Sequence, residues 1–189
     1  MIVKPALAGA LVLASLPPLE WPVTIYTQHP FIERMECGTA TGTGFKLSNG
    51  LWVTANHVTS GRGCFVDGKP VTVIYSNRET DLAVFVVDDD RAGGIEVNCE
   101  GFRDRAWYFG EGHGRGDPNP QIVAVRYSAL FTAFNNGPWG ILEVNRFVPG
   151  MSGGPVLSQD GRAVGVVNAY GTVQKISFSM PLKDTPLCR

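Results

Sequence analysis

The sequence predicts an all-β protein whose two halves each contain about six short strands. Of its 189 residues, 23 are glycine and 13 are proline, and turns rich in these residues separate short apolar runs along the chain. Long helical patterns are few. Many short strands joined by glycine- and proline-rich turns are typical of β-sandwiches and β-barrels. The length is enough for one or two small domains with a hydrophobic core.

Six strand candidates lie in the first half, and two glycine turns set their pairing. Asn-Gly between apolar runs is a strong hairpin signal, and it occurs here in Ser48-Asn49-Gly50. A second hairpin is expected around Asp67-Gly68. The polar segment Asp88–Gly94 is the candidate connection to the second half, with its charges expected to be solvated. The expected strands are Val23–Thr27, Gly42–Lys46, Leu51–Thr54, Cys64–Val66, Val71–Tyr75 and Asp81–Val87.

The second half repeats this style without repeating the sequence. A tight turn is expected at Gln159-Asp160-Gly161, and no repeat of 20–50 residues is visible. The glycine- and proline-rich stretch around His113 predicts a loop. The strand candidates are Ala106–Phe109, Ile122–Leu130, Gly140–Val144, Gly154–Leu157, Ala163–Asn168 and Lys175–Ser179.

The N-terminus has the pattern of a secretory signal segment, assigned to residues 1–20. Met1–Lys4 is a short positive region, Ala6–Leu16 is apolar, and Pro17-Pro18 ends the segment, with cleavage expected after Ala14. The apolar run is shorter than the ~20 residues that a membrane-spanning helix needs, so no stable membrane insertion is expected. The protein is therefore expected to be secreted or periplasmic; an uncleaved N-terminal helix is the alternative.

Four cysteines in an exported chain suggest two disulfides, with three possible connectivities. Four free thiols in a cytosolic protein are the alternative. There is no C-x-x-C pair and no accompanying histidine cluster, so neither a metal site nor a cofactor is expected. The net charge is −1, the sequence pI is about 6.3, and basic residues are scattered, which argues against a nucleic-acid partner.

The string GMSGGP at Gly150–Pro155 is typical of a serine nucleophile carried on a glycine-rich turn. A serine hydroxyl needs a neighbouring base to become a nucleophile. Upstream of Ser152 lie His57 in TANHV and Asp81 in TDLAV, each beside an apolar run. The order His, Asp, Ser is one of the chain orders in which a catalytic triad occurs.

Two other chain orders of a catalytic triad fit this sequence less well. An α/β-hydrolase has the same G-x-S-x-G pattern but needs its histidine after the serine, whereas all three histidines precede Ser152. The order Asp, His, Ser could be met by Asp81, His113 and Ser152, but the loop expected around His113 offers no rigid support for an imidazole.

Four motifs in this order resemble trypsin-like serine proteases with the chymotrypsin fold. The likeness covers roughly Val23 to Leu182 and is greatest to the compact bacterial and viral branch that includes Deg-type and glutamyl endopeptidases. The motifs are GTGF (Gly42–Phe45), WVTANHV (Trp52–Val58), TDLAVF (Thr80–Phe85) and GMSGGPV (Gly150–Val156).

The resemblance implies two six-stranded antiparallel β-barrels of the chymotrypsin type, with the active site in the cleft between them. The barrels would comprise residues 21–94 and 95–189. His57 would act as general base, Asp81 would orient its imidazole, and Ser152 would be the nucleophile. The backbone N–H groups of Gly150 and Ser152 would form the oxyanion hole. The implied function is a secreted serine endopeptidase that acts on protein or peptide substrates.

The resemblance identifies the substrate-binding residues less specifically than the catalytic ones. Asn168, Ala169 and Tyr170 would form the edge strand beside the substrate. In trypsin-like enzymes that prefer Lys or Arg, an aspartate lies six residues before the serine; here that residue is Arg146, and no acidic residue follows it before the serine. A preference for Lys or Arg is therefore not expected. A buried Arg146 would favour a carboxylate, whereas an exposed one would play no part.

The resemblance also suggests the disulfides and the mode of activation. Digestive relatives bracket their histidine with a disulfide, which favours Cys37–Cys64 and leaves Cys99–Cys188. Met151 stands where relatives activated from zymogens have an aspartate, so no internal cleavage is expected. Two other functions remain open: an inactive protease-fold binding module, and an esterase or acyl transferase using the same triad.

Overall fold

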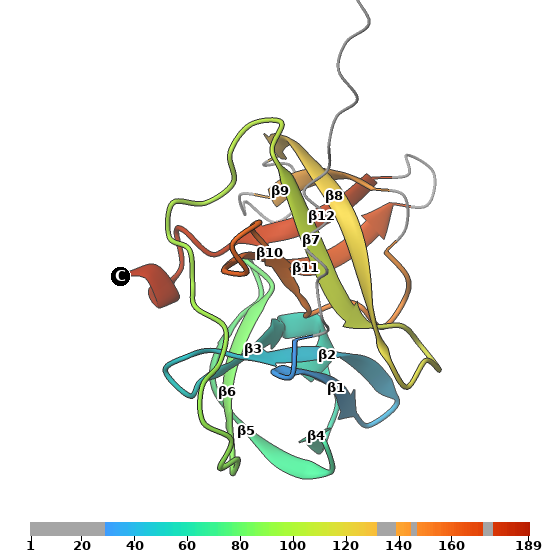
Figure 1. The fold of residues 1–189 in the computed structure, drawn as a ribbon. Coiled ribbons are helices and arrows are strands. Elements are labelled where there is room, and N and C mark those ends of the chain that lie inside the picture. The colour runs from blue at the N-terminus through green and yellow to red at the C-terminus, as the bar shows by residue number, and fades with distance from the viewer. Residues whose placement is uncertain (1–28, 132–138, 145–146, 172–175) are drawn as a thin grey trace, which may run out of the picture.

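The computed structural model describes residues 29–131, 139–144, 147–171 and 176–189, which form two closed antiparallel barrels of six strands each. The predicted fold class is confirmed. The barrels lie one above the other in Figure 1. The first contains β1 (Ile32–Cys37), β2 (Ala40–Lys46), β3 (Trp52–Ala55), β4 (Cys64–Val66), β5 (Lys69–Asn77) and β6 (Leu82–Val87). The second contains β7 (Trp107–His113), β8 (Pro120–Phe131), β9 (Trp139–Val144), β10 (Pro155–Leu157), β11 (Ala163–Gly171) and β12 (Ile176–Pro181).

The first strand of the structure, β1, is one that the sequence did not predict. Its sequence IERMEC has three charged residues among six, which hides the alternation of a strand. Ile32, Met35 and Cys37 are nevertheless buried, and β1 pairs with both β2 and β4 to close the barrel. The strand expected at Val23–Thr27 lies outside the described residues.

The two hairpins predicted in the first barrel are present. Strands β4 and β5 are joined directly through Asp67 and Gly68, which both have positive φ, at 50° and 71°. Two successive positive φ values are those of a type I′ turn, whose twist matches that of the flanking strands. Gly50, with φ of 85°, occupies the turn between β2 and β3.

Strand β7 is longer than the sequence indicated, and this corrects the expectation that His113 lies in a loop. Residues Trp107–His113 pair along their whole length with β8, and His113 is buried at the last position of the strand. The glycines here serve close packing, because a side chain at Gly110 would collide with the ring of Phe147. His113 lies against the carbonyl of Ile32 at 3.4 Å, so the alternative triad through His113 gains no support.

The segment between β6 and β7 runs along one side of the molecule from the first barrel to the second (Figure 1). Its residues pair with both barrels: Ile95 forms a parallel bridge with Leu47, and Val97 forms one with Ala163. Backbone N–H groups of Ile95 and Ala163 donate to Lys46 and Glu96 carbonyls, each at 2.8 Å. We keep the predicted barrel limits, residues 21–94 and 95–189, as a proposal.

The charges expected to be solvated in this connection include one buried carboxylate. The side chain of Asp89 is 1% exposed and forms ion pairs with Lys46 at 3.2 Å and with Arg91 at 2.9 Å. The neighbouring cations hold the pKa of Asp89 at about 2, although burial alone would raise it. Arg91 also pairs with Glu33 on β1, so the connection is fastened to the first barrel by charges.

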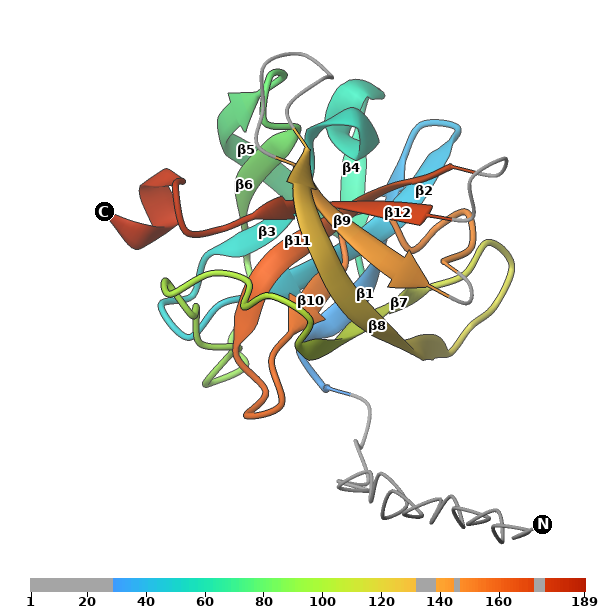
Figure 2. The same ribbon diagram turned by 90° about the horizontal axis from the view of Figure 1, so that it is seen from above.

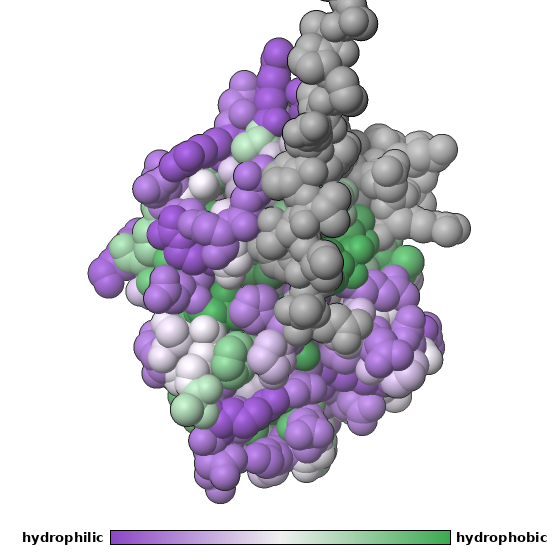
Figure 3. Space-filling view, in the orientation of Figure 1, coloured by the Kyte–Doolittle hydropathy of each residue, from purple (hydrophilic) through white to green (hydrophobic). Residues whose placement is uncertain are grey.

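One hydrophobic cluster extends through both barrels. It contains Trp52 and Phe85, whose rings stack at 5.9 Å between centroids, together with Leu157 and Met180 from the second barrel. Because these residues are essentially inaccessible to solvent, the two barrels share an apolar, buried interface. The surface differs from this apolar interior: the face of the molecule seen in Figure 3 is mostly hydrophilic.

Both disulfides have the pairing that the sequence predicts. Cys37 and Cys64 are directly opposite each other on β1 and β4, with Cα atoms 4.1 Å apart. Cys99 is joined to Cys188 in the short C-terminal helix η2 (Pro186–Cys188), which lies at one side of the molecule in Figure 2. Within the residues described, no helix is long and apolar enough to span a membrane.

Candidate active site

His57 lies immediately after β3, in the short helix η1 (Asn56–Ser60). The end of β3 is held beside the start of β6, because Asn56 N–H donates to the carbonyl of Asp81 at 2.9 Å. The carbonyl of His57 accepts the hydroxyl of Ser60 at 2.7 Å. The side chain of His57 is 49% exposed, so the ring is fixed at its base and accessible at its tip.

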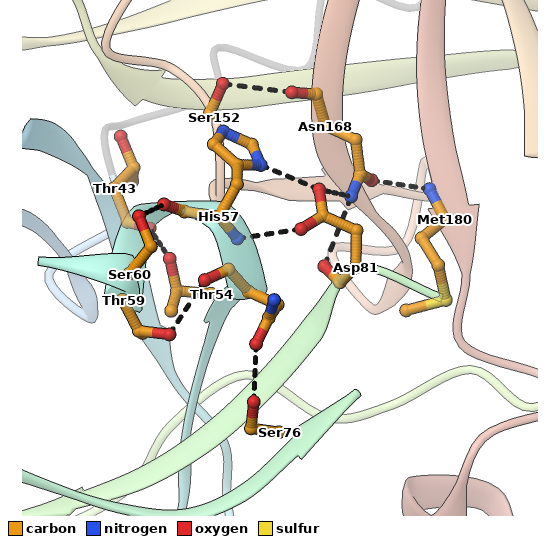
Figure 4. A network of polar contacts seen from close by, with 11 residues as sticks. Thr43, Thr54, His57, Thr59, Ser60, Ser76, Asp81, Ser152, Asn168 and Met180 are labelled. Atoms are coloured by element: carbon orange, nitrogen blue, oxygen red, sulfur yellow. Dashed lines mark hydrogen bonds and ion pairs between the residues drawn. The ribbon is translucent and has the colours of Figure 1, made fainter. Parts of the chain in front are cut away.

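Asp81 meets His57 through both of its carboxylate oxygens (Figure 4). Oδ1 accepts the backbone N–H of His57 at 2.7 Å, and Oδ2 lies 2.7 Å from Nδ1 of the ring. A carboxylate only accepts hydrogen bonds, so Nδ1 carries the proton and Nε2 is left to accept one. Asp81 has a positive φ of 51°, a conformation that aspartate tolerates better than most residues. The structure therefore places these two candidate residues in direct contact.

Asn168 is a third member of this group. Its Nδ2 donates to Asp81 Oδ2 at 2.8 Å and lies 3.3 Å from the Asp81 carbonyl. Its Oδ1 accepts the backbone N–H of Met180 at 2.8 Å, which fixes the orientation of the amide. A bulge in β11 between Val167 and Ala169 redirects this one residue. The sequence suggested only a main-chain role for Asn168, and no local signal could announce a partner 87 residues away.

Ser152 follows a tight turn formed by Val148-Pro149-Gly150-Met151. Met151 N–H donates to the carbonyl of Val148 at 3.1 Å, and Gly150 has a φ of 102°. A positive φ at glycine in the third position is what distinguishes a type II turn, and proline is common in its second position. The stretch that the sequence analysis assigned to the nucleophile is therefore a turn whose shape depends on Pro149 and Gly150.

The backbone N–H groups around Ser152 divide into two sets. Those of Met151, Gly153 and Gly154 donate to carbonyls of Val148, Val167 and Met151. Those of Gly150 and Ser152 have no acceptor among the described residues. Two N–H groups that alternate along a turn and lack a protein acceptor are suited to binding an anionic oxygen.

The hydroxyl of Ser152 donates to the carbonyl oxygen of Asn168 at 3.0 Å. Figure 4 shows the Ser152 side chain beside the distal edge of the His57 ring, opposite the edge that meets Asp81. Across the part of the chain that the structure describes, no hydrogen bond joins Ser152 to His57. The three residues predicted from the sequence are thus brought together where the two barrels meet.

Gly153 is what allows the Ser152 turn to approach the first barrel. It has a φ of 89°, and a Cβ atom in this position would overlap the carbonyl oxygen of Thr43 and the hydroxyl of Thr54. Only glycine fits both the conformation and the space. The backbone of Ser152 is also bonded to the first barrel, since Thr43 N–H donates to the carbonyl of Ser152 at 2.8 Å.

The strand β11 offers an unpaired edge next to Ser152. On one side its residues 169–171 pair with β12, whereas on the other side the pairing with β10 extends only as far as Val166, opposite Pro155. Among the described residues, no strand pairs with that second side at Ala169 and Tyr170. Such an edge accepts an extended peptide by backbone hydrogen bonds. Arg146, the candidate specificity residue, lies outside the described residues.

Among the acidic residues of this region, the buried Glu111 on β7 has the pKa that departs most from its ordinary value. Glu111 is inaccessible to solvent, and its Oε1 accepts the backbone N–H of His29 at 2.9 Å. Its Oε2 has no partner among the described residues. Burial raises the pKa of Glu111 to about 7, and the bond from His29 offsets part of this rise. Burial also lowers the pKa of His29.

The described residues contain no group of three or more His, Cys, Asp or Glu side chains arranged to hold a metal ion. The polar groups of the site are instead arranged as a chain from Asn168 through Asp81 to His57, with Ser152 next to it (Figure 4).

Several solved structures have the same fold at low sequence identity. The active form of the Rv3671c protease from M. tuberculosis superposes with a TM-score of 0.71 at 20% identity, covering 96% of this chain and 89% of that one. The HtrA-type protease AlgW with a tripeptide gives a TM-score of 0.72 at 22% identity, covering 82% and 57%.

Sequence comparison gives two curated relatives. The serine protease Do-like HtrA of Bacillus subtilis (strain 168) is 27% identical over an alignment of 173 residues that covers 80% of this chain and 38% of the relative. The probable periplasmic serine endoprotease DegP-like of Chlamydia pneumoniae is 30% identical over 159 residues, covering 74% and 32%. This chain therefore spans about a third of the length of each of these two relatives. Residues 42–166 match the family described as the trypsin-like peptidase domain. With two closed barrels and a match over most of its length, the chain belongs to the family of trypsin-like peptidase domains.

Proposed function

We propose that the protein is a serine endopeptidase in which His57, Asp81 and Ser152 form the catalytic triad. The observation that carries this proposal is the position of His57: Asp81 Oδ1 accepts its backbone N–H, Asp81 Oδ2 meets Nδ1 of its ring, and the other edge of the ring is turned toward Ser152. Membership of a peptidase family supports it.

The proposed reaction follows from the protonation state of the ring. Nε2 of His57 accepts the proton of Ser152 while Oγ attacks the carbonyl carbon of the scissile peptide bond. The imidazolium then gives this proton to the leaving amine, and the acyl group remains on Oγ. The C–N bond breaks as the amine leaves. A water molecule then attacks the acyl carbon as the same nitrogen takes its proton, the C–Oγ bond breaks to release the acid, and the imidazolium returns the proton to Oγ. Asp81 stabilises the imidazolium through the bond to Nδ1 in both halves of the reaction.

The oxyanion formed in each half would bind to the N–H groups of Gly150 and Ser152. Their lack of an acceptor among the described residues supports this role. One donor of this kind typically contributes a factor of about 10²–10³ to kcat.

Substrate binding would also release the nucleophile. The carbonyl of Asn168 holds the hydroxyl of Ser152 at 3.0 Å, and it lies at the start of the unpaired edge of β11. An extended substrate that pairs with Asn168, Ala169 and Tyr170 would donate an N–H to this carbonyl. The hydroxyl would then lose its acceptor and turn, by rotation about Cα–Cβ, toward Nε2 of His57.

We further propose that substrates with Lys or Arg before the scissile bond are not preferred, because no acidic residue occurs from Arg146 to Met151. A preference for Glu or Asp would follow if the Arg146 guanidinium points into the pocket.

We also propose that the protein is exported. The signal-like segment at residues 1–20 and the two disulfides support a secreted or periplasmic location. The Chlamydia pneumoniae relative is described as periplasmic, which agrees with this proposal.

The test compares the protein with Ser152→Ala on a peptide library, on ester substrates and with a fluorophosphonate label. Loss of the nucleophile is expected to lower kcat for peptides about 10⁶-fold and to abolish labelling. Equal cleavage by both proteins would refute the proposal. A wild-type protein that is neither labelled nor active would be a binding module, and one that cleaves only esters would be an esterase or acyl transferase.

A further inference from the structure

Thr43 on β2 belongs to the first barrel, yet its side chain is bonded to the turn that carries Ser152. Thr43 is completely buried. Its Oγ1 accepts the backbone N–H of His113 at 2.9 Å and donates to the carbonyl oxygen of Gly150, also at 2.9 Å. The hydroxyl therefore has a partner on each side, one at the end of β7 and one in the turn.

A second bond holds the preceding carbonyl of the same turn. The backbone N–H of Arg115, two residues beyond β7, donates to the carbonyl of Pro149 at 2.7 Å. In a trans peptide the C=O and N–H bonds point in opposite directions. Fixing the carbonyl of Pro149 therefore fixes the direction of the Gly150 N–H, and fixing the carbonyl of Gly150 orients the peptide that follows.

These two bonds matter because the turn alone does not determine that direction. Type I and type II turns connect the same end points and differ chiefly in the orientation of their central peptide, here Pro149–Gly150. Proline in the second position is compatible with both types, and glycine in the third position imposes no φ of its own. A flipped peptide would point the carbonyl of Pro149 to where the N–H of Gly150 now points.

We propose that Thr43 is a positioning residue for the reaction: its hydroxyl, held by the end of β7, fixes the peptide after Gly150, while the bond from Arg115 fixes the peptide before it. Together the two bonds hold Gly150 at its φ of 102°, with its N–H directed at the oxyanion. This inference rests on the proposed function of the site. Thr43 does not touch the reacting atoms. It acts through Gly150, and the bond from Arg115 to Pro149 acts in the same sense.

The backbone of Thr43 makes separate contacts that a side-chain substitution leaves in place. Its N–H donates to the carbonyl of Ser152 at 2.8 Å, and its carbonyl accepts the hydroxyl of Thr54 at 2.7 Å. Thr43→Val has nearly the same shape as threonine and removes only the hydroxyl. Thr43→Ser keeps the hydroxyl and removes the methyl group.

Thr185 provides a matched control far from the turn. It is 3% exposed, and its hydroxyl also donates to a carbonyl, that of Leu182 at 2.7 Å, while accepting the N–H of Leu187 at 3.3 Å. Thr185→Val therefore removes a buried hydroxyl of the same kind from the C-terminal segment. Its cost in stability should be similar, with kcat unchanged.

The experiment measures kcat and KM separately for the wild type and the variants, with thermal unfolding in parallel. A misdirected donor should cost no more than the loss of a donor, so Thr43→Val is expected to lower kcat by a factor of about 10–100 with KM changed less than about threefold. Thr43→Ser is expected to restore kcat to within about threefold of the wild type, since it keeps the relay.

Three results would overturn the inference: wild-type kcat in Thr43→Val, no rescue by Thr43→Ser, or an equal loss in Thr185→Val. If Thr43→Val does not fold, Arg115→Pro removes the second bond from an exposed position and should give the same selective loss of kcat. A wild-type protein whose activity does not depend on Ser152 would refute the proposed function and this inference together. Dependence on Ser152 with a normal Thr43→Val would refute this inference alone.

Discussion

His57 and Asp81 lie 24 residues apart in one barrel and bind each other directly, whereas the Ser152 turn belongs to the other barrel and depends on partners as far as 107 residues away. The first pair is built by two adjacent strand ends, β3 and β6, and by bonds between its own two residues. The nucleophile instead sits on a turn that β2, β7 and β11 hold from three sides.

The two regions therefore differ in whether the residues that hold a reacting group in place also take part in the reaction. Within the first barrel the residues that hold the base are the same residues that react, so a substitution there changes the reaction directly. Around Ser152 the residues that hold the donors are remote and take no part in the chemistry. Substitutions of residues that only orient the turn before Ser152 should therefore lower activity by graded amounts, whereas substitutions of His57 or Asp81 should be severe.

The severe case is Asp81→Asn. Asparagine also tolerates positive φ, and its carbonyl oxygen keeps the bond to the His57 backbone N–H. Its NH₂ group, however, would face Nδ1 of His57 and Nδ2 of Asn168, both now bonded to Oδ2. The ring should turn to the wrong tautomer, and kcat should fall about 10⁴-fold. Steady-state kinetics with an unfolding curve measures this; a loss of less than tenfold would mean that Asp81 does not orient the base.

Removing each of the two disulfides in turn should lower the free energy of unfolding by different amounts. Loop entropy predicts a cost of about 3–4 kcal/mol for removing Cys37–Cys64 and about 4–5 kcal/mol for removing Cys99–Cys188, because the second closes a longer loop. The separations are 27 and 89 residues. The shorter one should nevertheless affect activity more, since Gly61, just after η1, packs directly against the Cys37 carbonyl. Each disulfide is removed by replacing both of its cysteines with serine, and urea unfolding and kcat are measured for both variants. Loss of Cys99–Cys188 should cost more stability, and loss of Cys37–Cys64 should cost more activity. If one variant loses more of both, this account is contradicted.

The smallest of these effects concerns pH and Glu111. Its pKa is about 7 in the folded protein, above the 4.5 of an ordinary glutamate. Between these values the folded state keeps a proton that the unfolded chain has lost, so the free energy of unfolding falls as pH rises and levels off above pH 7. Glu111→Gln cannot titrate, and its stability relative to the wild type should rise across this window by up to about 3 kcal/mol.

Unfolding curves of both proteins from pH 4 to 8 provide the measurement. The lowered pKa of His29 makes the free energy of unfolding rise with pH, which is opposite to the effect of Glu111. Because this contribution is present in both proteins, it cancels in the difference between them, which then reports on Glu111. A constant difference across the range would show that Glu111 does not carry the shift.

The fold class and the hairpins could be predicted from the sequence, and His57 and Asp81 could be named as candidates, because each has a local signal. Asn49-Gly50 marks a turn in any context, and TANHV and TDLAV each contain their own strand end. β1 was missed because Glu33, Arg34 and Glu36 conceal its alternation, although its Met35 is fully buried. His113 was misassigned because glycines that serve close packing resemble the glycines of a loop.

The side-chain roles of Asn168 and Thr43 had no local signal at all. Asn168 reaches Asp81 only because of a bulge in β11 and the closure of both barrels. Thr43 is an ordinary strand threonine until β7 and the Ser152 turn are folded against it. Such contacts depend on the register of strands that are distant in the sequence, which no short motif encodes.

The strand-like connection after β6 has a further consequence for engineering. Ile95 and Val97 pair with Leu47 and Ala163, so this stretch is part of the architecture of both barrels rather than a tether between them. An inserted reporter or affinity module would have to break backbone bonds here, whereas the turns at Gly50 and Gly68, where an added Cβ meets no other atom, leave room for one. The two barrels are thus poor candidates for exchange as separate modules, and new loops belong at the hairpin tips.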